Sequence, residues 1–201
     1  MDEQVVKQIT ESLGSPEAAA VMASRERVTG WFAGTAPLIQ WDVIPSPLGP
    51  LYIAASVKGL CSVDFGVSEA GFINRLDPLA RAVRDPAALA PIAEQIQAYF
   101  AGTRLRFDAP LDLDQLTPFQ TSVLQTARRI PPGSVWTYGR VARALGKPQA
   151  SRAVGQALGR NPVPIVIPCH RVIASDGSLG GYSGGGGLES KRFLLQLEGA
   201  L

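Results

Sequence analysis

The pattern of apolar and polar positions between residues 40 and 66 predicts a small β-sheet. Three runs rich in β-branched and aromatic residues, QWDVI, LYIAAS and LCSVDF, are separated by the turn sequences PSPLGP and VKG. Connections this short favour an antiparallel meander. Cys61 falls in the third run among apolar neighbours, so we expect a buried thiol that acts as a small hydrophobe.

Apolar residues at helical spacing predict a helix over residues 86–101, which would cover this sheet. The apolar face comprises Leu89, Ile92, Ile96, Tyr99 and Phe100. Residues 39–112 are therefore expected to form a first, structural module. Before it, DEQVVKQITESL and PEAAAVMASRERV have helical patterns and a turn-rich segment follows. We treat residues 1–38 as an amino-terminal extension to which the sequence assigns no role.

A second module, residues 113–201, is expected to open with a capped helix. Thr117 is suited to the N-cap, Pro118 to the first helical position, and Gln120 completes a capping box. The inward-facing residues of this helix would be Phe119, Val123, Leu124 and Ala127.

Two short helical patterns then follow around Gly146 and Pro148, in the outline of a helix-turn-helix. The second helix, Ala150 to Leu158, consists largely of small residues, with Arg152 as its one long cation. Small side chains let a helix press against another surface. Ordinary packing of one helix on another would use them equally well.

Composition limits the classes of protein that remain. With 201 residues, 46% of them hydrophobic, the chain can bury a core. No apolar segment approaches the ~20 residues of a membrane span. Residues 1–13 carry acids where a signal peptide would be basic, so we expect a cytoplasmic protein with no membrane association. Two cysteines and one histidine exclude a disulfide framework and a zinc site built from Cys and His alone, and we predict no metal.

Charge is unevenly distributed along the chain. The net charge is only +2, yet residues 115–175 contain eight Lys and Arg and no Asp or Glu. The remainder has 11 basic and 17 acidic residues, a net charge of −6. A basic half of this kind favours a polyanionic partner such as nucleic acid. The alternative is a solvated basic face without a partner.

The segment NPVPIVIPCHRVI, residues 161–173, places a cysteine beside the single histidine of the chain. A thiol with an ordinary pKa is mostly protonated at neutral pH and needs a base or positive charge to become nucleophilic. In an extended segment, neighbouring side chains point to opposite faces, so Cys169 and His170 would not touch directly. A thiol hydrolase that uses this pair stays open, although it leaves the charge asymmetry unexplained.

The sequence TYGRVARALGKPQASRAVGQALGRNPVPIVIPCHRVIASDGSLGGYSGG closely resembles the active-site half of the O6-alkylguanine-DNA alkyltransferases, whose signature is PCHRV. The resemblance is strong over residues 117–199 and weaker over 40–112. It implies an α+β fold: a small ribonuclease-H-like amino-terminal domain with an antiparallel sheet and helices, then a mostly helical, winged-helix-like helix-turn-helix domain.

The resemblance also implies a reaction and a partner. Members of this family repair double-stranded DNA that contains O6-alkylguanine by moving the alkyl group irreversibly onto their own cysteine, one lesion per molecule and without a cofactor. The sequence does not decide whether larger alkyl groups or O4-methylthymine are accepted. We expect a monomer, and association of molecules along DNA stays open.

By the same resemblance, five residues form the catalytic group. Cys169 is the nucleophile, His170 acts on it through a bridging water, and Glu198 orients the imidazole. Asn161 holds the active-site turn, and Tyr138 donates a hydrogen bond to the base ring. From the residues alone, Glu198 would be a solvated acid near the carboxyl end and Asn161 an ordinary turn residue.

The resemblance further implies contacts with the flipped base and with the duplex. Arg152 would enter the base stack in place of the flipped nucleotide. The second helix of the helix-turn-helix would lie in the minor groove, where its small residues Ser151, Ala153 and Gly155 allow a close approach. The base pocket would be formed by backbone groups of Cys169 and Val172, together with Ser183, Tyr182 and Leu158.

One departure from the family pattern lies in GYSGGGGLESK, which has more glycines after Tyr182 than the family predicts; we expect flexible closure of the pocket there. Two other classes stay in view. A helix-turn-helix transcription regulator would share the basic stretch. Non-catalytic alkyltransferase-like proteins bind damaged DNA but replace the nucleophilic cysteine, which this chain retains as Cys169.

Overall fold

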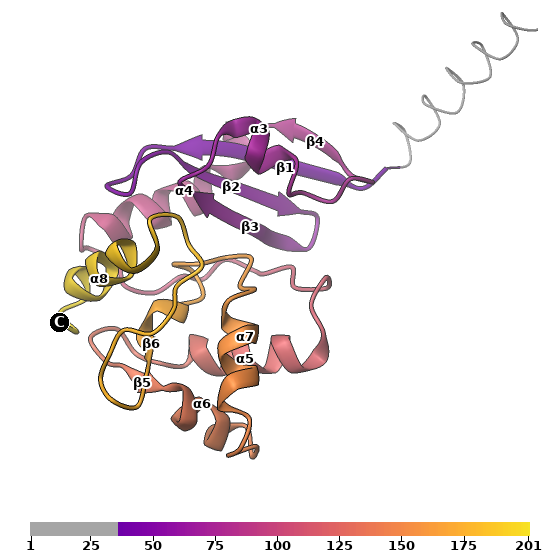
Figure 1. The fold of residues 1–201 in the computed structure, drawn as a ribbon. Coiled ribbons are helices and arrows are strands. Elements are labelled where there is room, and N and C mark those ends of the chain that lie inside the picture. Colours follow the sequence, from indigo (N-terminus) through magenta and orange to yellow (C-terminus); the bar gives the residue numbers. More distant parts are fainter. Residues whose placement is uncertain (1–35) are drawn as a thin grey trace, which may run out of the picture. The chain divides into compact units, whose positions relative to one another are not determined.

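The computed structural model describes residues 36–201, so the two helices predicted within residues 1–35 lie outside the described residues. The remainder folds as one compact unit, Leu38–Leu201 (Figure 1). Its elements in the amino-terminal half are β1 (Leu38–Ile44), β2 (Leu51–Ser56), β3 (Gly59–Phe65), α3 (Glu69–Ile73), β4 (Arg81–Arg84) and α4 (Pro86–Phe100). Those in the carboxyl-terminal half are α5 (Pro118–Arg128), β5 (Trp136–Thr137), α6 (Tyr138–Ala144), α7 (Ser151–Leu158), the 3-10 helix η1 (Cys169–Arg171), β6 (Val172–Ile173) and α8 (Gly187–Leu197).

The amino-terminal sheet has the strand order β3-β2-β1-β4. The predicted meander is confirmed, because β2 pairs antiparallel with both β1 and β3. The sheet is nevertheless mixed, since β4 joins β1 in parallel, with Ile39 opposite Ala82. Strand β4 thus departs from the antiparallel sheet that was expected. Four residues with an arginine at each end give no alternating apolar pattern, and such charged, short strands are typical of sheet edges.

The two faces of the sheet bury different sets of side chains, as the period of two along a strand requires. Leu51 and Ile53 of β2 point into the main core, which also contains Leu89 and Ile96 of α4. Their neighbours on the opposite face enter a smaller apolar cluster that comprises Ile39, Trp41, Tyr52, Ala54, Phe72 and Leu76. Helix α4 therefore covers one face of the sheet, as its apolar face predicted, and α3 contributes Phe72 to the other.

The carboxyl-terminal half is built on α5, α6 and α7, which contact one another. The predicted capping box is confirmed: the Thr117 hydroxyl accepts from Gln120 N, and the Gln120 side chain accepts from Thr117 N. Helices α6 and α7 form the predicted helix-turn-helix outline, with Gly146 in the turn at a φ of 70°. The fold class predicted from the sequence is confirmed.

The two halves share one core. The main apolar cluster contains Ile53 and Phe65 of the sheet as well as Val163 and Ile167 of the segment before Cys169. The amide of Val63 in β3 donates to the carbonyl of Pro162 at 2.8 Å, which fastens that segment to the sheet edge. The domain boundary near residue 112 stays a prediction.

Within residues 36–201, no helix combines the length and apolar character that crossing a bilayer requires. The same part of the chain holds no group of three or more His, Cys, Asp or Glu side chains placed to bind a metal ion.

Candidate active site

The turn that carries Cys169 is held by the side chain of Asn161. Its Oδ1 accepts from Val163 N at 3.1 Å, and its Nδ2 donates to the carbonyl of Ile167 at 2.9 Å. Within this loop Ile165 has a φ of 74°, a left-handed conformation that is costly for a β-branched residue. The structure around it must therefore hold the turn against strain. The proposed turn-holding role of Asn161 is consistent with this geometry.

Cys169 opens a 3-10 turn, η1, rather than the extended segment that the sequence suggested. A proline immediately before the turn and the bonded loop of Asn161 bend the backbone here. Cys169 is 5% exposed, and within residues 36–201 the one side-chain hydrogen bond to its sulfur comes from Asn161 Nδ2 at 3.2 Å. Burial raises the pKa of the Cys169 thiol, while the Asn161 bond and the charge of Lys191 act in the opposite direction. The resting thiol is therefore mostly protonated at neutral pH and needs a base.

The position and protonation state of His170 are those that a general base requires. Its Nε2 lies 2.9 Å from Glu198 Oε1, and both side chains are fully buried. Burial lowers the pKa of His170, so the ring is neutral near pH 7. For Glu198, burial alone would raise the pKa, but hydrogen bonds from His170 and Arg171 outweigh it and bring the pKa to about 2.

The tautomer of His170 follows from these states. An ionised carboxylate is an acceptor only, so Nε2 carries the hydrogen and Nδ1 the lone pair. Nδ1 is buried and has no hydrogen-bond partner among the residues that the structure describes. A neutral imidazole with a free lone pair and a carboxylate behind it is the arrangement of a general base.

Glu198 is buried at the end of α8 and accepts from two further residues. Arg171 donates through Nε to Oε2 at 2.7 Å and through Nη2 to Oε1 at 2.8 Å. Tyr99 donates its hydroxyl hydrogen to Oε1 at 2.8 Å. The sequence counted Arg171 among the cations for a polyanion; this is wrong, because the side chain is buried and neutralises Glu198. Its position next to His170 was the signal that it belongs to the site.

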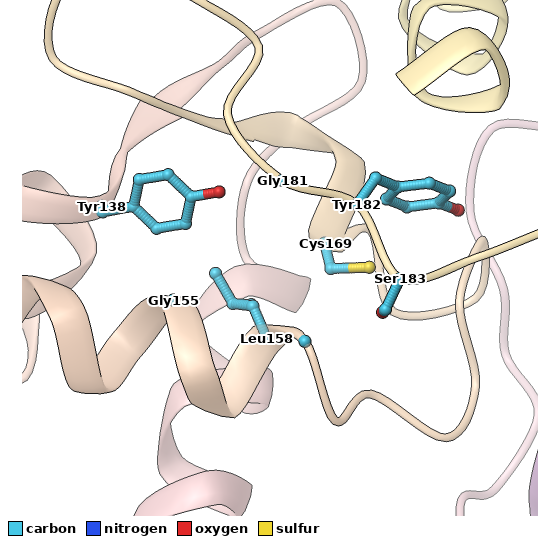
Figure 2. A pocket seen from close by; sticks show the side chains of 8 residues that line it. Tyr138, Gly155, Leu158, Cys169, Gly181, Tyr182 and Ser183 are labelled. Atoms are coloured by element: carbon cyan, nitrogen blue, oxygen red, sulfur yellow. The ribbon is translucent and has the colours of Figure 1, made fainter. Parts of the chain in front are cut away.

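A pocket of about 170 Å³ opens above the Cys169 sulfur. In Figure 2, Cys169 lies between Tyr138 on one side and Tyr182 with Ser183 on the other, over the α7 residues Gly155 and Leu158. The lining consists of Tyr138, Gly155, Leu158, Gly159, Cys169, Gly181, Tyr182 and Ser183. Drug-sized ligands need roughly 300–1,000 Å³, so this cavity suits a small ligand.

Three of the predicted pocket residues, Leu158, Tyr182 and Ser183, line this cavity together with Cys169 and Tyr138, which were predicted as catalytic residues. Val172 does not: its side chain is buried, and its carbonyl accepts from Lys191 Nζ at 2.5 Å. Any contact between that carbonyl and a ligand would have to use its second lone pair.

Lys191 is a residue of this site that the sequence did not reveal. Its ammonium group is buried and donates to the carbonyls of Val172 and Gly181, the latter at 3.2 Å. Burial lowers the pKa of Lys191 to about 8, although the neighbouring Cys169 acts to raise it. Lys191 thus joins two walls of the pocket and places positive charge near the sulfur. A lysine in an amphipathic helix is usually solvent-exposed, so this role could not be predicted from the sequence pattern.

The glycine-rich loop packs closely against the end of β3. A Cβ added at Gly185 would lie 2.0 Å from the Phe65 carbonyl oxygen, and one at Gly184 would lie 2.6 Å from the Tyr182 ring. These two glycines therefore have a steric reason to be glycine. The flexible closure expected for this loop stays a prediction.

A shallow depression of about 360 Å³ adjoins the pocket along α7. Its lining comprises Tyr138, Gly139, Ser151, Arg152, Gly155, Ala174 and Ser175. Ala153 lies on the same helix but not in this lining. Six of the eight cations of residues 115–175 are exposed, namely Arg129, Arg140, Arg143, Lys147, Arg152 and Arg160. The depression thus combines small residues with the exposed cation Arg152, and the other exposed cations lie elsewhere in the same half of the chain, as a polyanionic partner would favour.

Cys61 is half-buried rather than buried, because β3 lies at the sheet edge and this side chain is only partly covered. Its thiol donates to the Ala54 carbonyl at 3.3 Å, and burial raises its pKa to about 11. Such a thiol is unreactive at neutral pH, which agrees with the structural role predicted for it.

Two family descriptions match the chain. Residues 118–200 match the DNA binding domain of 6-O-methylguanine DNA methyltransferase, and residues 39–113 match the ribonuclease-like domain of 6-O-methylguanine DNA methyltransferase.

Several individual proteins are similar to this chain over most of its length and over most of their own. A methylated-DNA–protein-cysteine methyltransferase from Methanosarcina barkeri is 43% identical over 79% of this chain and 96% of that protein. The Mycobacterium tuberculosis protein of the same name is 40% identical over 80% of this chain and 93% of its own length. The crystal structure of M. tuberculosis OGT in complex with DNA superimposes with a TM-score of 0.69 at 39% identity, covering 80% and 93% of the two chains. An archaeal O6-methylguanine-DNA methyltransferase from Pyrococcus kodakaraensis gives a TM-score of 0.55 at 28% identity, covering 80% and 99%.

Proposed function

This chain belongs to the 6-O-methylguanine DNA methyltransferase family, and we propose that Cys169 is the residue that accepts the alkyl group. The protein is an enzyme of DNA repair that transfers a methyl group from damaged guanine to a protein cysteine. The observation that carries the assignment is the position of the Cys169 sulfur in the lining of a small pocket, bonded to Asn161 and adjacent in sequence to a buried His170–Glu198 pair.

Activation of the sulfur begins at His170. Because Glu198 fixes the hydrogen on Nε2, the lone pair of Nδ1 is available to take the Cys169 proton through a bridging water. The thiolate that forms is stabilised by the Asn161 amide and by the positive charge of Lys191. Glu198 stabilises the imidazolium in return, and Arg171 holds the Glu198 carboxylate in place.

Transfer is a direct displacement at carbon. The sulfur forms a bond to the methyl carbon as the carbon–O6 bond breaks, and the electron pair leaves on the base. Tyr138, whose ring lines the pocket, stabilises the departing base by donating a hydrogen bond to its ring. A proton returns from the imidazolium to the base through solvent, so the products are neutral guanine and S-methylcysteine.

The reaction is stoichiometric in this proposal. A thioether is a poor leaving group, so S-methylcysteine has no easy route back to a thiolate. Each molecule therefore repairs one lesion, and the DNA itself is the methyl donor, so no cofactor takes part.

Access to the lesion requires the nucleotide to leave the stack, at a cost of a few kcal/mol. Arg152 stands at the rim of the depression along α7 and would fill the gap in the stack. The small residues Ser151, Ala153 and Gly155 would let α7 approach the minor groove. The exposed cations around them would offset the cost of flipping through contacts with phosphates. The enzyme would act as a monomer on double-stranded DNA; its cytoplasmic location and any association along DNA stay predictions of the sequence.

The test is an intact-mass measurement after incubation with a duplex that contains one O6-methylguanine. We expect the mass of one methyl group, located on the Cys169 peptide, with one lesion lost per protein molecule. A Cys61→Ala variant should behave like the wild type, and Cys169→Ala should bind the duplex without gaining mass.

Other results would identify other functions. Tight binding of the lesion by unmodified wild-type protein would indicate a recognition protein, and many lesions lost per molecule would contradict single-turnover transfer. Peptidase activity that disappears in Cys169→Ala would favour the thiol hydrolase.

A further inference from the structure

We propose that Tyr99 is a positioning residue of the catalytic site, through which the amino-terminal half of the chain holds the Glu198–His170 pair in its working geometry. The inference rests on the proposed function, because it assigns a role to a residue that acts on the proposed base through Glu198. Tyr99 contacts neither the pocket nor the sulfur.

The geometry places three donors on one oxygen. Glu198 Oε1 accepts from His170 Nε2 at 2.9 Å, from Arg171 Nη2 at 2.8 Å and from the Tyr99 hydroxyl at 2.8 Å. Two of these donors come from the turn that carries Cys169. The third comes from α4, 99 residues away from Glu198 in the sequence.

The phenol is held rigidly, so it can hold the carboxylate in turn. Tyr99 is fully buried and packs edge-on against Phe100, with ring centroids 5.4 Å apart, and against Phe107 at 5.5 Å. Helix α8, at whose end Glu198 lies, runs beside α4 (Figure 1), and Phe100 packs against Phe193 of α8 at 6.5 Å. Tyr99 thus reaches Glu198 from a fixed helix.

The hydroxyl does more than fill space, because it shares the oxygen that orients His170. Burial and the adjacent Glu198 raise the pKa of Tyr99, so the phenol remains a donor throughout the useful pH range. With the hydroxyl removed, Oε1 keeps two donors and becomes more basic. It then draws the Nε2 hydrogen more strongly and favours the charged imidazolium, while the carboxylate is less firmly held.

Other charged groups face His170 and stay unchanged in this comparison. Glu198 favours the imidazolium, whereas Arg171 and Lys191 oppose it. A change in the proton affinity of His170 after loss of the Tyr99 hydroxyl would therefore come through Glu198 Oε1.

The matched variants are Tyr99→Phe and Tyr52→Phe. Tyr52 is also a buried tyrosine of the amino-terminal half, but it stacks on Phe72 at 5.1 Å in the smaller apolar cluster on the other face of the sheet. Each variant loses one hydroxyl from a buried ring, and only Tyr99→Phe loses it at Glu198.

The experiment is the rate of methyl transfer from an O6-methylguanine duplex, measured from pH 5 to 9 for wild type and both variants. We expect Tyr99→Phe to be slower at its optimum by about tenfold, the scale of one hydrogen bond to a charged group. Its acidic limb should move to higher pH, because the base is protonated more readily. Tyr52→Phe should keep the wild-type profile. A wild-type rate in Tyr99→Phe, or a loss of rate with an unmoved acidic limb, would overturn the inference.

A second measurement separates this inference from the proposed function. Iodoacetamide modifies thiolates without any DNA, so its rate on Cys169, followed by peptide mapping, reports the same base. If wild-type protein takes no methyl group from DNA, the proposed function fails. The Tyr99 inference then stands if Tyr99→Phe still shifts the pH dependence of Cys169 modification, and fails if it does not.

Discussion

Asn161 Nδ2 donates to the carbonyl of Ile167 at 2.9 Å and lies 3.2 Å from the sulfur of Cys169. An amide nitrogen carries two hydrogens, so one group can serve both acceptors. The residue that shapes this turn is therefore also placed to stabilise negative charge on Cys169, the proposed nucleophile.

Replacing Asn161 by aspartate removes both bonds that Nδ2 donates, to the Ile167 carbonyl and to the sulfur, and keeps the one that Oδ1 accepts. The Asp side chain has the same shape and still accepts from Val163 N, but it loses the donor at the sulfur and adds negative charge beside it. The pKa of Cys169 should rise and methyl transfer should slow by about 100-fold, the scale of losing a charge-assisted contact. Single-turnover kinetics on a lesion duplex measure this. A rate within twofold of wild type would show that Asn161 does not act on the sulfur.

Glu198→Gln should weaken the fold as well as the reaction. The folded-state pKa of Glu198 is about 2, below its ordinary value of 4.5, so its stabilising contribution is complete above pH 4.5 and is lost as the pH falls through 2. Glutamine leaves Arg171 without its counter-charge, and we expect a loss of about 3 kcal/mol in the free energy of unfolding at pH 7. Urea unfolding at pH 7 and pH 3.5 should show a smaller difference between wild type and variant at the lower pH. A difference independent of pH would mean that the carboxylate charge is not the cause.

Because the glycine-rich loop packs against β3, alanine at Gly185 should destabilise the protein more than alanine at Gly187. A Cβ at Gly185 would meet the Phe65 carbonyl oxygen at 2.0 Å, whereas one at Gly187 has no neighbour within 4 Å. Gly185→Ala should push the loop with Ser183 off the sheet, lower the free energy of unfolding by about 1–3 kcal/mol and slow transfer. Gly187→Ala carries a φ penalty without the clash and serves as the control. Thermal unfolding with transfer rates compares them, and equal effects of both variants would rule out the steric explanation.

Local chemistry made part of this molecule predictable. The capping box of Thr117 and Gln120 and the apolar face of α4 depend on residues close together in the sequence, and both are confirmed. The resemblance around PCHRV likewise identified residues that the structure brings around one pocket, although Val172 lies outside its lining. These signals lie within short segments, where spacing alone determines which side chains meet.

Long-range partners could not be predicted in this way. Nothing near Tyr99 indicates that its hydroxyl meets Glu198, 99 residues later. Arginine and lysine are usually surface residues, and only the fold shows that Arg171 and Lys191 are buried, where Arg171 donates to the Glu198 carboxylate and Lys191 to backbone carbonyls. Strand β4 was not predicted either, because this short edge strand forms by pairing with β1 and its own four residues have no strand-like alternation of apolar and polar positions.

Replacing Arg152 should slow methyl transfer from duplex DNA without changing the methyl-transfer step itself. Arg152 is exposed and lines the depression beside Tyr138. Arg152→Ala should slow transfer from a duplex by about tenfold or more, because no side chain then fills the gap that the flipped nucleotide leaves in the base stack. Transfer from the free base O6-methylguanine should stay unchanged. Arg81→Ala, an exposed arginine of β4, is the control for loss of charge alone. Equal losses on duplex and free base would place Arg152 in the chemical step instead.

Lys191→Gln should separate stability from activity. Glutamine keeps donors for the carbonyls of Val172 and Gly181 but removes a buried charge, whose pKa of about 8 lies below the ordinary 10.5. Between these two pH values the unfolded chain binds the proton and the folded chain does not, so the free energy of unfolding of the wild type should rise with pH there, by roughly 3 kcal/mol relative to the variant.

The rate of methyl transfer should fall in Lys191→Gln, although the variant is not destabilised. The positive charge of Lys191 lowers the pKa of Cys169, so its removal leaves less thiolate and slower transfer at pH 7.5, even though the variant is at least as stable there. Chemical unfolding at pH 7.5 and pH 10, with transfer rates at pH 7.5, tests both parts. If the stability difference is the same at both pH values, Lys191 is not a strained buried cation. If only the rate is unchanged, its charge does not act on the sulfur, and its function is to join the two walls of the pocket.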